Sequence, residues 1–558
     1  MRNIRARFAN GTTLLSPRIS GMFPFLVALF VANFGQPITI LAGEDPVFDL
    51  KSLLAPPLNA RTLKTTESEG IVTEEVMFHS EIDQGKSVDI FGLFSYPKRA
   101  AHLPAMIWNQ GGLSQATPYW TEFAARRGYA ALCIDFPLPG YRSTGGYPIN
   151  SGVDLTDDPR QAPIYHGAVA LLRAVSFLES RSEVNKDRIG MAGSSWGGFY
   201  TTLMIGIDSR LKVGSCMFGC GALQLGNSWW DNAPGDNKRD TAFRERWAAT
   251  LDPASRLAKS KTPIAWITGT NDSFYWLPAV MKSHELAAGP KHLSLLANWN
   301  HALTPTLDEQ VFAWLDVHLK DADKFLEVGT LAVTDDGIAH WQVRGPRQPT
   351  RATILASYGE AGHWASRYWI ETDAALDGDQ CTASLPKSGL PGFAVGTVYD
   401  QNGFCYSTPV VKIKATAPNG ITPRYNGCSL WGNFDKPGQD FLKLHGLPVP
   451  SIKESSDGLQ VELSKGKHTF GPILYTADTK HLFQLNVTAT QATTVTISLQ
   501  GTFDGKRLSE SRPIEARSDV QEVTIPYVPP AALSGGLHVE IDVPAESIRI
   551  SQMRFLSQ

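Results

Sequence analysis

Between about residues 70 and 320, short apolar runs rich in β-branched residues alternate with longer stretches of helical periodicity. This alternation is typical of a largely parallel sheet with helices on both faces. We therefore predict an α/β domain over residues 43–322. Its expected strands are 88–96, 105–108, 130–134, 188–193, 213–217, 264–268 and 293–296, and its expected helices include 162–179, 277–288 and 307–319.

After about residue 323 the sequence changes to alternating apolar and polar residues punctuated by Gly and Pro, which predicts an all-β region. The expected strands there include 459–463, 482–487, 494–499 and 538–543. A Gly- and Pro-rich connector at 419–436 divides this region. We expect a β-rich accessory region at 323–420 and a C-terminal β-sandwich at 421–558, which has the size of one sandwich domain.

The segment Gly193-Ser194-Ser195-Trp196-Gly197 follows an expected strand and precedes a helical pattern. A serine between glycines in this context is typical of a nucleophile elbow, a strained turn that projects the hydroxyl above the sheet. The motif alone is weak evidence, because short patterns of this kind also arise by chance. Its place between a strand and a helix strengthens it. The glycine spacing centres on Ser195 rather than Ser194, so Ser195 is the predicted nucleophile.

Two further residues would complete a catalytic triad. Asp272 follows the expected strand 264–268 after a glycine turn and is the predicted acid, with Asp231 and Asp252 as weaker alternatives. His301 follows the last expected strand of the α/β domain and is the predicted general base. The order Ser, Asp, His along the chain is the one that accompanies a nucleophile elbow.

An acyl-transfer enzyme also needs N–H donors directed at the oxyanion that develops during the reaction. The amide of Trp196, directly after the predicted nucleophile, is the first expected donor. The second is expected from the loop 108–113, where paired glycines allow the backbone to approach a substrate, with Gly112 or Leu113 as the donor. The alternative for this loop is an ordinary β-turn.

Aromatic residues gather in the loops expected above the sheet. Such rings could stack on sugars, or they could form an apolar lid or the packing of a larger domain. These candidate substrate-binding residues are Trp229, Trp230, Tyr275, Trp276 and Trp299.

These motifs resemble those of secreted α/β-hydrolases of the acetylxylan-esterase, dienelactone-hydrolase and prolyl-oligopeptidase-like group, over about residues 70–320. The resemblance is carried by Asp187-Arg-Ile-Gly-Met-Ala-Gly-Ser-Ser195-Trp-Gly-Gly, by Gly269-Thr-Asn-Asp272 and by Asn300-His301. The segment Ile267-Thr-Gly-Thr-Asn-Asp272 is also similar to the acidic-residue region of hydrolases related to the PhoPQ-activated pathogenicity proteins. The chain departs from the group at Trp196, where Gln or Tyr is more usual, and it lacks the N-terminal propeller of the peptidase branch.

The resemblance implies an α/β-hydrolase fold and hydrolysis of an ester, often an acetyl group on a polysaccharide, with no metal or organic cofactor. Ser195 would attack the carbonyl, His301 would carry the proton and Asp272 would orient the imidazolium. Two alternatives stay open: a serine peptidase or amidase with the same triad, and a non-catalytic secreted glycan-binding protein. The C-terminal module resembles, in texture only, the jelly-roll sandwiches of secreted carbohydrate-active enzymes, and glycan binding and simple shielding are equal alternatives for it.

The N-terminus has a basic start, an apolar stretch from Met22 to Phe34, and small residues at Ala42-Gly43. This pattern predicts a signal peptide at 1–42 and a secreted or periplasmic protein, although a retained anchor is the alternative. The apolar stretch is short for a membrane span, which needs about 20 residues. A net charge of −3 without runs of like charge argues against a nucleic-acid partner. The expected partner is a small-molecule or polysaccharide ester, and the oligomeric state stays open.

The chain contains six cysteines. Cys133 and Cys216 lie in expected strands, where a thiol acts as a small hydrophobe. Cys216 and Cys220 have the spacing of half a metal site, but no second Cys/His pair accompanies them at zinc-finger spacing, so no metal site is expected. In the C-terminal half, Cys381 and Cys405 could form a disulfide.

Overall fold

The computed structural model describes residues 45–557. Its internal gaps are 113–114, 148–154, 232–238, 273, 300, 302–304, 359–363, 365–366, 368, 387, 389–390, 416–450, 456–457, 474–480, 504–505, 529–533 and 545–546. The predicted signal peptide at 1–42 and the predicted connector at 419–436 lie outside the described residues. Within the described ranges, no helix combines the length and the apolarity needed to cross a membrane.

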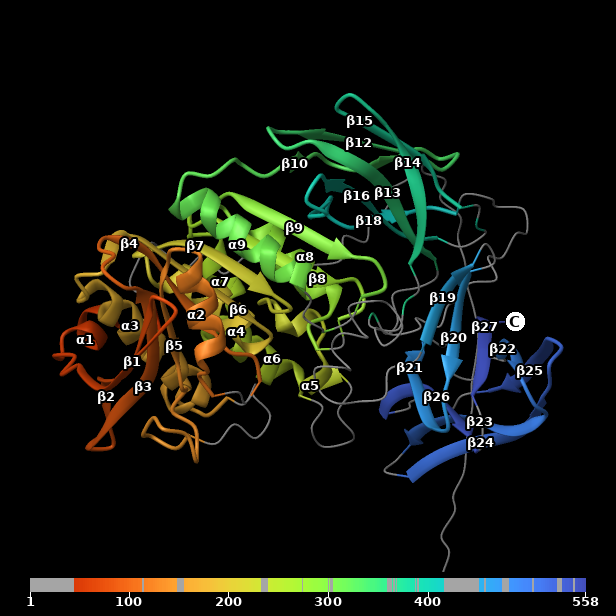
Figure 1. Ribbon diagram of the computed structural model, residues 1–558, viewed down its shortest axis with the longest axis horizontal. Coiled ribbons are helices and arrows are strands. Elements are labelled where there is room, and N and C mark those ends of the chain that lie inside the picture. Colours follow the sequence, from red (N-terminus) through yellow and green to blue (C-terminus); the bar gives the residue numbers. More distant parts are fainter. Residues whose placement is uncertain are drawn as a thin grey trace, which may run out of the picture. The chain divides into compact units, whose positions relative to one another are not determined.

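The described residues between 61 and 296 contain a mixed sheet of nine strands with helices between them (Figure 1). Its strand order is β1-β2-β3-β5-β4-β6-β7-β8-β9. The first three strands and the β3–β5 pair are antiparallel, whereas every pair from β5 through β4 to β9 is parallel. The strands are β1 (Arg61–Ser68), β2 (Ile71–Asp83), β3 (Lys86–Pro97), β4 (Leu103–Asn109), β5 (Ala130–Ile134), β6 (Val184–Ser194), β7 (Leu211–Met217), β8 (Ile264–Gly269) and β9 (Lys291–Leu296).

Side chains of the parallel strands alternate between two apolar cores, one on each face of the sheet. In β4, Ala105 and Ile107 belong to the core that contains α3 and α4, whereas Met106 and Trp108 belong to the core that contains α2 and α9. Helices therefore cover both faces, as a parallel sheet requires. The helices are α1 (Leu50–Leu54), α2 (Pro118–Arg126), α3 (Pro163–Glu179), α4 (Trp196–Ile207), α5 (Ser228–Asp231), α6 (Thr241–Thr250), α7 (Ala254–Leu257), α8 (Leu277–Leu286) and α9 (Pro305–Leu319).

This arrangement confirms the predicted fold class for the N-terminal half of the chain. The parallel strands, the helices on both faces and the strand-to-helix turn from β6 into α4 are features of the α/β-hydrolase fold. Because β4, β6, β8 and β9 run parallel, their carboxyl ends lie at one edge of the sheet, where this class of fold places its ligands.

A second, antiparallel sheet follows, with strand order β10-β12-β15-β14-β13-β16-β17, to which β11 and β18 add at the sides. It packs against the first sheet: the Leu295 amide of β9 donates to Ser407 Oγ at 3.0 Å, and Trp341 and Ile354 share the core that contains α9. Its strands are β10 (Glu327–Val328), β11 (Ala332–Val333), β12 (Ile338–Arg344), β13 (Pro349–Tyr358), β14 (Ile370–Asp377), β15 (Gln380–Ser384), β16 (Gly392–Asp400), β17 (Cys405–Ser407) and β18 (Val411–Ile413).

The C-terminal segment forms two antiparallel sheets that share one core. Phe483 and Ile525 enter this core from one sheet, and Ile497 and Ile541 enter it from the other. The more specific expectation of a jelly roll stays a prediction. One sheet contains β19 (Ser451–Ser455), β20 (Gly458–Leu463), β27 (Ile548–Ser557), β22 (His481–Ala489) and β25 (Gln521–Tyr527), and the other contains β21 (Gly466–Ile473), β26 (Ser534–Val543), β23 (Thr493–Phe503) and β24 (Lys506–Ala516).

The Cys381–Cys405 disulfide considered from the sequence does not form. Both residues are buried free thiols, Cys381 on β15 and Cys405 on β17. These strands lie at separate places in the second sheet, with β14, β13 and β16 between them. Burial raises the pKa of the Cys381 thiol to about 11, so it stays protonated at neutral pH.

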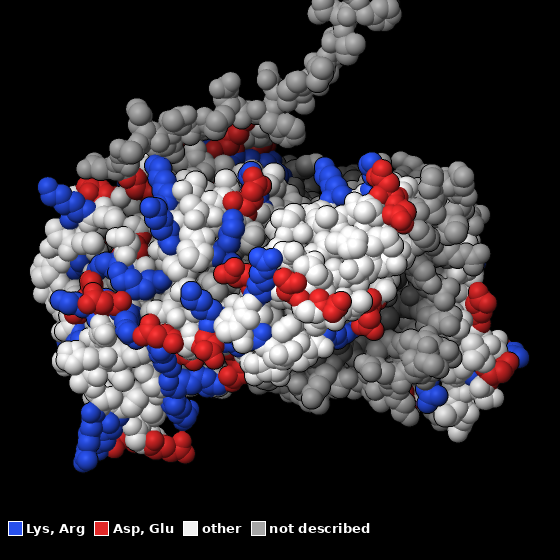
Figure 2. Space-filling model, turned by 90° about the horizontal axis from the view of Figure 1, so that it is seen from above, with Lys and Arg blue, Asp and Glu red and all other residues white. Residues whose placement is uncertain are grey.

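Basic and acidic side chains intermingle on the face of the molecule shown in Figure 2. Exposed ion pairs among the described residues likewise place basic beside acidic side chains, such as Lys98 with Glu67 at 2.7 Å and Arg126 with Glu122 at 3.3 Å. Interspersed charges of this kind produce no broad electrostatic field of one sign on the face in Figure 2.

The separate core of the C-terminal module leads to a first prediction. A chain that ends near residue 420 should unfold within about 3 °C of the corresponding transition in the full chain, since the module's core contributes little to the rest. Differential scanning calorimetry of both proteins measures this. In the full chain, Ile541→Ala should lower the module's transition only, because the methylenes it removes lie in the module's core. A fall in both transitions would show that the cores are coupled.

Candidate active site

Ser195 occupies the turn between β6 and α4 with a backbone conformation that non-glycine residues rarely adopt. Its φ is 56° and its ψ is −120°. The surrounding structure holds this turn: the Ser195 amide donates to the Met217 carbonyl of β7 at 2.9 Å, and its carbonyl accepts from the Phe199 amide at 2.9 Å. Such strain persists only where neighbouring structure imposes it, and it is concentrated at functional sites.

The two glycines of the motif are required by close packing against β4. An ideal Cβ at Gly193 would lie 2.7 Å from the Asn109 carbonyl oxygen, and one at Gly197 would lie 2.1 Å from the same atom. Real Cβ atoms do not approach backbone this closely, so neither position accepts a side chain. The nucleophile turn therefore lies directly on the end of β4.

Asp272 follows β8 and is 2% exposed. Its Oδ1 accepts hydrogen bonds from the amides of Phe274 at 2.8 Å and Tyr275 at 2.9 Å, and Thr268 Oγ1 donates to Oδ2 at 3.4 Å. These donors stabilise a carboxylate in a buried site. The alternative acid, Asp252, is used elsewhere, because its carboxylate accepts from the amides of Ala222, Leu223 and Ala254.

His301 lies against this carboxylate, as the sequence motif predicts. Its Nδ1 is 2.9 Å from Oδ2 and 3.1 Å from Oδ1 of Asp272. An ionised carboxylate only accepts hydrogen bonds, so this geometry selects the neutral tautomer with the proton on Nδ1 and the lone pair on Nε2. The ring packs 5.3 Å from the Phe218 ring and 4.9 Å from the Phe274 ring, and 15% of the side chain is exposed.

The nucleophile turn and the His301–Asp272 pair meet at the same edge of the sheet. The Ser195 amide is bonded to Met217, and the next residue, Phe218, contacts the His301 ring. The interactions of the described residues do not include a hydrogen bond between Ser195 Oγ and His301 Nε2. Hydrogen bonds of this kind are often long in unliganded enzymes and shorten when substrate binds.

Of the residues expected to donate to the oxyanion, only Trp196 directly follows Ser195. Trp196 is the first residue of α4, so its amide is one of the helix-initial N–H groups that have no intrahelical acceptor. Gly112 is exposed with φ of 59°, and Leu113 lies outside the described residues. The closest approach is made by Gly111, whose ideal Cβ would lie 3.1 Å from the Ser195 Cβ. The paired glycines in the sequence predict a close approach of this loop but do not distinguish Gly111 from Gly112.

Four of the five candidate stacking aromatics do not fit a sugar-binding role. Trp230, Tyr275, Trp276 and Trp299 are each less than 10% exposed and serve as packing. Trp229 is half-buried, with its ring 5.1 Å from the Trp196 ring. An aromatic that sequence analysis missed, Phe274, is 41% exposed and contacts His301. Its signal in the sequence was its place two residues after the predicted acid.

The Cys216 and Cys220 pair is buried and free. Burial raises the pKa of the Cys216 thiol to about 12 and that of Cys220 well above its usual value. Thiolate chemistry at neutral pH is therefore disfavoured. Over the described part of the chain, no group of three or more His, Cys, Asp or Glu side chains is arranged to hold a metal ion.

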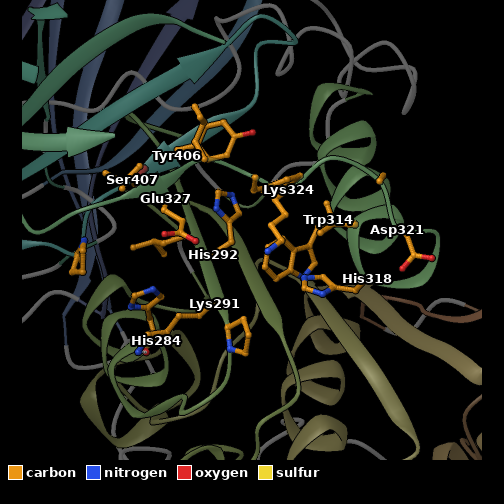
Figure 3. A pocket seen from close by; sticks show the side chains of 18 residues that line it. His284, Lys291, His292, Trp314, His318, Asp321, Lys324, Glu327, Tyr406 and Ser407 are labelled. Carbon is orange, nitrogen blue, oxygen red and sulfur yellow. Dashed lines mark hydrogen bonds between the residues drawn. The ribbon is translucent and has the colours of Figure 1, made fainter. Parts of the chain in front are cut away.

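A cavity of about 620 Å³ lies between β9, the end of α9 and the second sheet (Figure 3). It is separate from the candidate triad, because it is lined by Lys291 and His292 at the start of β9, whereas His301 follows the end of that strand. His292 lies between Trp314 and Tyr406, with ring centroids 5.8 and 5.1 Å away. Burial lowers the pKa of His292 to about 3, so the imidazole is neutral.

No family model matches the chain, and no curated protein matches it either. Solved structures do match. An acetyl xylan esterase from Paenibacillus sp. R4 is 20% identical with a TM-score of 0.41, over 48% of this chain and 92% of the esterase. Acetyl xylan esterase 1 from Thermoanaerobacterium sp. JW/SL YS485 is 14% identical with a TM-score of 0.41, over 48% and 89%. A glucuronoyl esterase from Solibacter usitatus is 13% identical with a TM-score of 0.34, over 47% and 86%.

The close packing at the nucleophile turn predicts that Gly197→Ala is strongly destabilising. The new methyl would lie 2.1 Å from the Asn109 carbonyl oxygen, so β4 or α4 must move. We expect a loss of more than about 3 kcal/mol of unfolding free energy, or no soluble protein. The control is Gly329→Ala, where the nearest atom is 3.6 Å away and a change within about 1 kcal/mol is expected. Urea unfolding of both variants compares them, and equal stability would contradict the packing argument.

The neutral state of His292 predicts a pH-dependent stability. Between pH 6.5 and 3 the unfolded state binds a proton that the folded state excludes, so stability falls as pH decreases through this window. At pH 5 the effect of this one residue is about 2 kcal/mol. Urea unfolding at pH 7 and pH 5 measures the decrease in the free energy of unfolding. This decrease should be smaller by about this amount in His292→Gln than in the parent protein. Identical decreases in the two proteins would contradict the prediction.

Proposed function

We propose that this chain is a serine hydrolase that cleaves carboxylic esters through an acyl-enzyme, with Ser195 as the nucleophile. The observation that carries the proposal is the His301–Asp272 pair beside a strained serine at the carboxyl edge of a parallel sheet. In this arrangement one imidazole nitrogen is held by a carboxylate and the other is available to a hydroxyl. This is the geometry by which a triad is recognised.

The proposed reaction proceeds in two halves. Ser195 Oγ bonds to the substrate carbonyl carbon while His301 Nε2 takes the hydroxyl proton. The tetrahedral intermediate collapses, and the leaving alcohol takes that proton from Nε2. Water then attacks the acyl-enzyme by the same route and restores the serine. The Trp196 amide and the loop that carries Gly111 and Gly112 would stabilise the oxyanion in both halves.

Asp272 is proposed to stabilise the charged imidazolium without taking its proton. Three donors besides His301 bond to its carboxylate: the amides of Phe274 and Tyr275 and the hydroxyl of Thr268. These bonds fix the orientation of the carboxylate. They also hold Nδ1 as the protonated nitrogen, which leaves Nε2 as the base.

The proposed substrate is an acetyl or similar small acyl ester on a carbohydrate, and the proposed location is secreted or periplasmic after removal of residues 1–42. The exposed Phe274 and the half-buried Trp229 support a substrate with a ring, because they provide aromatic surface near His301. Their rings are 5.8 Å apart. The C-terminal module is proposed as a glycan-binding or shielding element.

A serine peptidase or amidase would use the same triad and is the second candidate. A screen on p-nitrophenyl acetate, longer acyl esters, acetylated xylan and aminoacyl anilides separates the candidates. Turnover of anilides above esters would favour the peptidase. Binding of glycans without any turnover would favour a non-catalytic glycan-binding protein.

The mechanism predicts the effect of three substitutions on ester turnover. Ser195→Ala and His301→Ala should each lower kcat by at least about 10⁴, and the double variant should be scarcely worse, because the two residues act as one unit. Asp272→Asn should lower kcat by about 10⁴, because the amide favours the wrong imidazole tautomer. Steady-state kinetics on p-nitrophenyl acetate measures all of these.

Ser194→Ala is the matched control, since it removes a neighbouring hydroxyl from the same turn and should keep kcat within a few-fold of the parent. Circular dichroism establishes that every variant is folded. Substantial esterase activity in a folded Ser195→Ala protein would exclude Ser195 as the nucleophile.

A further inference from the structure

Two asparagines on the loops of the candidate acid and base make contacts that the proposed reaction does not use. Asn271 directly precedes Asp272, and Asn298 lies three residues before His301. Both side chains donate to backbone carbonyls just before β14 of the second sheet, at Arg367 and Trp369. We propose that Arg367 and Trp369 position the Asp272–His301 pair and that Asn298 is a positioning residue, an inference that rests on the proposed function.

The two loops are first bonded to each other. The Thr270 amide donates to the Leu296 carbonyl at 2.9 Å, and the Asn271 amide donates to the Trp299 carbonyl at 3.0 Å. The Asn298 amide in turn donates to Thr270 Oγ1 at 2.9 Å. These hydrogen bonds join the acid loop to the base loop, so a contact that restrains one loop also restrains the other.

Asn298 connects this unit to the second sheet by two reciprocal bonds. Its Nδ2 donates to the Trp369 carbonyl at 2.7 Å, and its Oδ1 accepts from the Trp369 amide at 2.7 Å. The side-chain amide thus bonds to both backbone polar groups of Trp369, as an opposite residue in an antiparallel strand would. Asn298 has φ of 52°, a conformation that asparagine tolerates better than most residues. Trp369 is fully buried and Asn298 is half-buried, so these bonds are only partly accessible to water.

Arg367 is itself fixed to the second sheet through its side chain. Its Nε donates to Ser357 Oγ at 3.1 Å, and one terminal nitrogen donates to the Tyr358 carbonyl at 3.2 Å, both at the end of β13. The guanidinium lies 4.8 Å from the centre of the Phe393 ring on β16. Arg367 is fully buried, and its own carbonyl accepts the bond from Asn271 Nδ2. Through these contacts of Arg367, the position of the acid loop depends on β13 and β16.

This chain of contacts has a consequence for the chemistry. Removal of the Asn298 side chain would leave Ser195, His301 and Asp272 intact but release the loop that orients the imidazole. The His301 Nε2 lone pair would then point at Ser195 Oγ for a smaller fraction of the time. A loss of alignment of this kind is expected to lower kcat and to leave substrate affinity little changed, because the Asn298 side chain bonds to the Trp369 backbone.

The test is Asn298→Gly in the full chain. Glycine accepts the positive φ, so the variant removes the two side-chain bonds without straining the backbone. The matched control is Asn59→Gly, since Asn59 has φ of 45° and is exposed on the surface. We expect kcat on p-nitrophenyl acetate to fall between about 10- and 100-fold in Asn298→Gly, with KM within about threefold. Asn59→Gly should leave both unchanged.

A second readout does not depend on turnover. In the ¹H–¹⁵N imidazole spectrum of the full-length protein, the His301 Nδ1–H signal should be protected from exchange in the parent and should be lost or exchange-broadened in Asn298→Gly. Asn298→Asp gives an independent variant, because it keeps an acceptor for the Trp369 amide but places a carboxylate oxygen against the Trp369 carbonyl. It should reproduce the loss of kcat and of the Nδ1–H signal, and it serves if the glycine variant does not fold.

A lowered melting temperature with unchanged kcat, pH–rate profile and Nδ1–H signal would overturn the proposal, because it would show a merely structural contact. If the parent hydrolyses no ester, the proposed function fails, yet the imidazole spectra still decide the positioning role. In that case a retained Nδ1–H signal in both Asn298 variants overturns the role, and its loss supports it.

Discussion

The parallel strands β4 to β9 are buried on both faces, and the rest of the molecule follows from that constraint. One face is covered by α3 and α4 and the other by α2 and α9, since bare parallel strands would expose continuous apolar surface. Because all of these strands run in one direction, the turns after them meet at a single edge. Ser195, Asp272 and His301 come from three different turns and are brought together only by this geometry. The second sheet then continues the core on the α9 face.

Local patterns in the sequence predict the strands, the helices and the places of Ser195, Asp272 and His301 after strands, because each of these depends on neighbours within a few residues. The glycines around Ser195 and the strand before Asp272 are signals of this kind. The burial of Trp230 and Trp299 could not be read in the same way, since it depends on helices and strands distant in the sequence. Likewise, Cys381 and Cys405 looked suitable for pairing by composition, yet strand order in the second sheet separates them. The contacts of Asn271 and Asn298 join segments about 70 to 100 residues apart and leave no periodic trace.

The second sheet and the C-terminal module differ in how they relate to the α/β part of the chain. Leu355 and Val395 of the second sheet, and Trp369 just before β14, lie in the same core as α3 and α4, whereas the module has a core of its own. The second sheet is therefore part of the α/β core, and of the two β regions only the C-terminal module has the separate core of an accessory region. Arg367, just before β14, is fully buried, and desolvation lowers its pKa to about 10. The border between the second sheet and the α/β part therefore contains a buried charged side chain.

The backbone of Ser195 has a consequence for how this site balances stability against activity. At φ of 56° and ψ of −120°, glycine would rest with less strain than serine, so a sequence chosen for stability alone would place glycine there. The chain instead retains a residue that is locally unfavourable, between two glycines that the packing does require. A destabilising residue kept in a position where a stabilising one fits is the pattern of a trade-off made for chemistry. The strained backbone of Ser195 therefore distinguishes this residue even before its hydroxyl is considered.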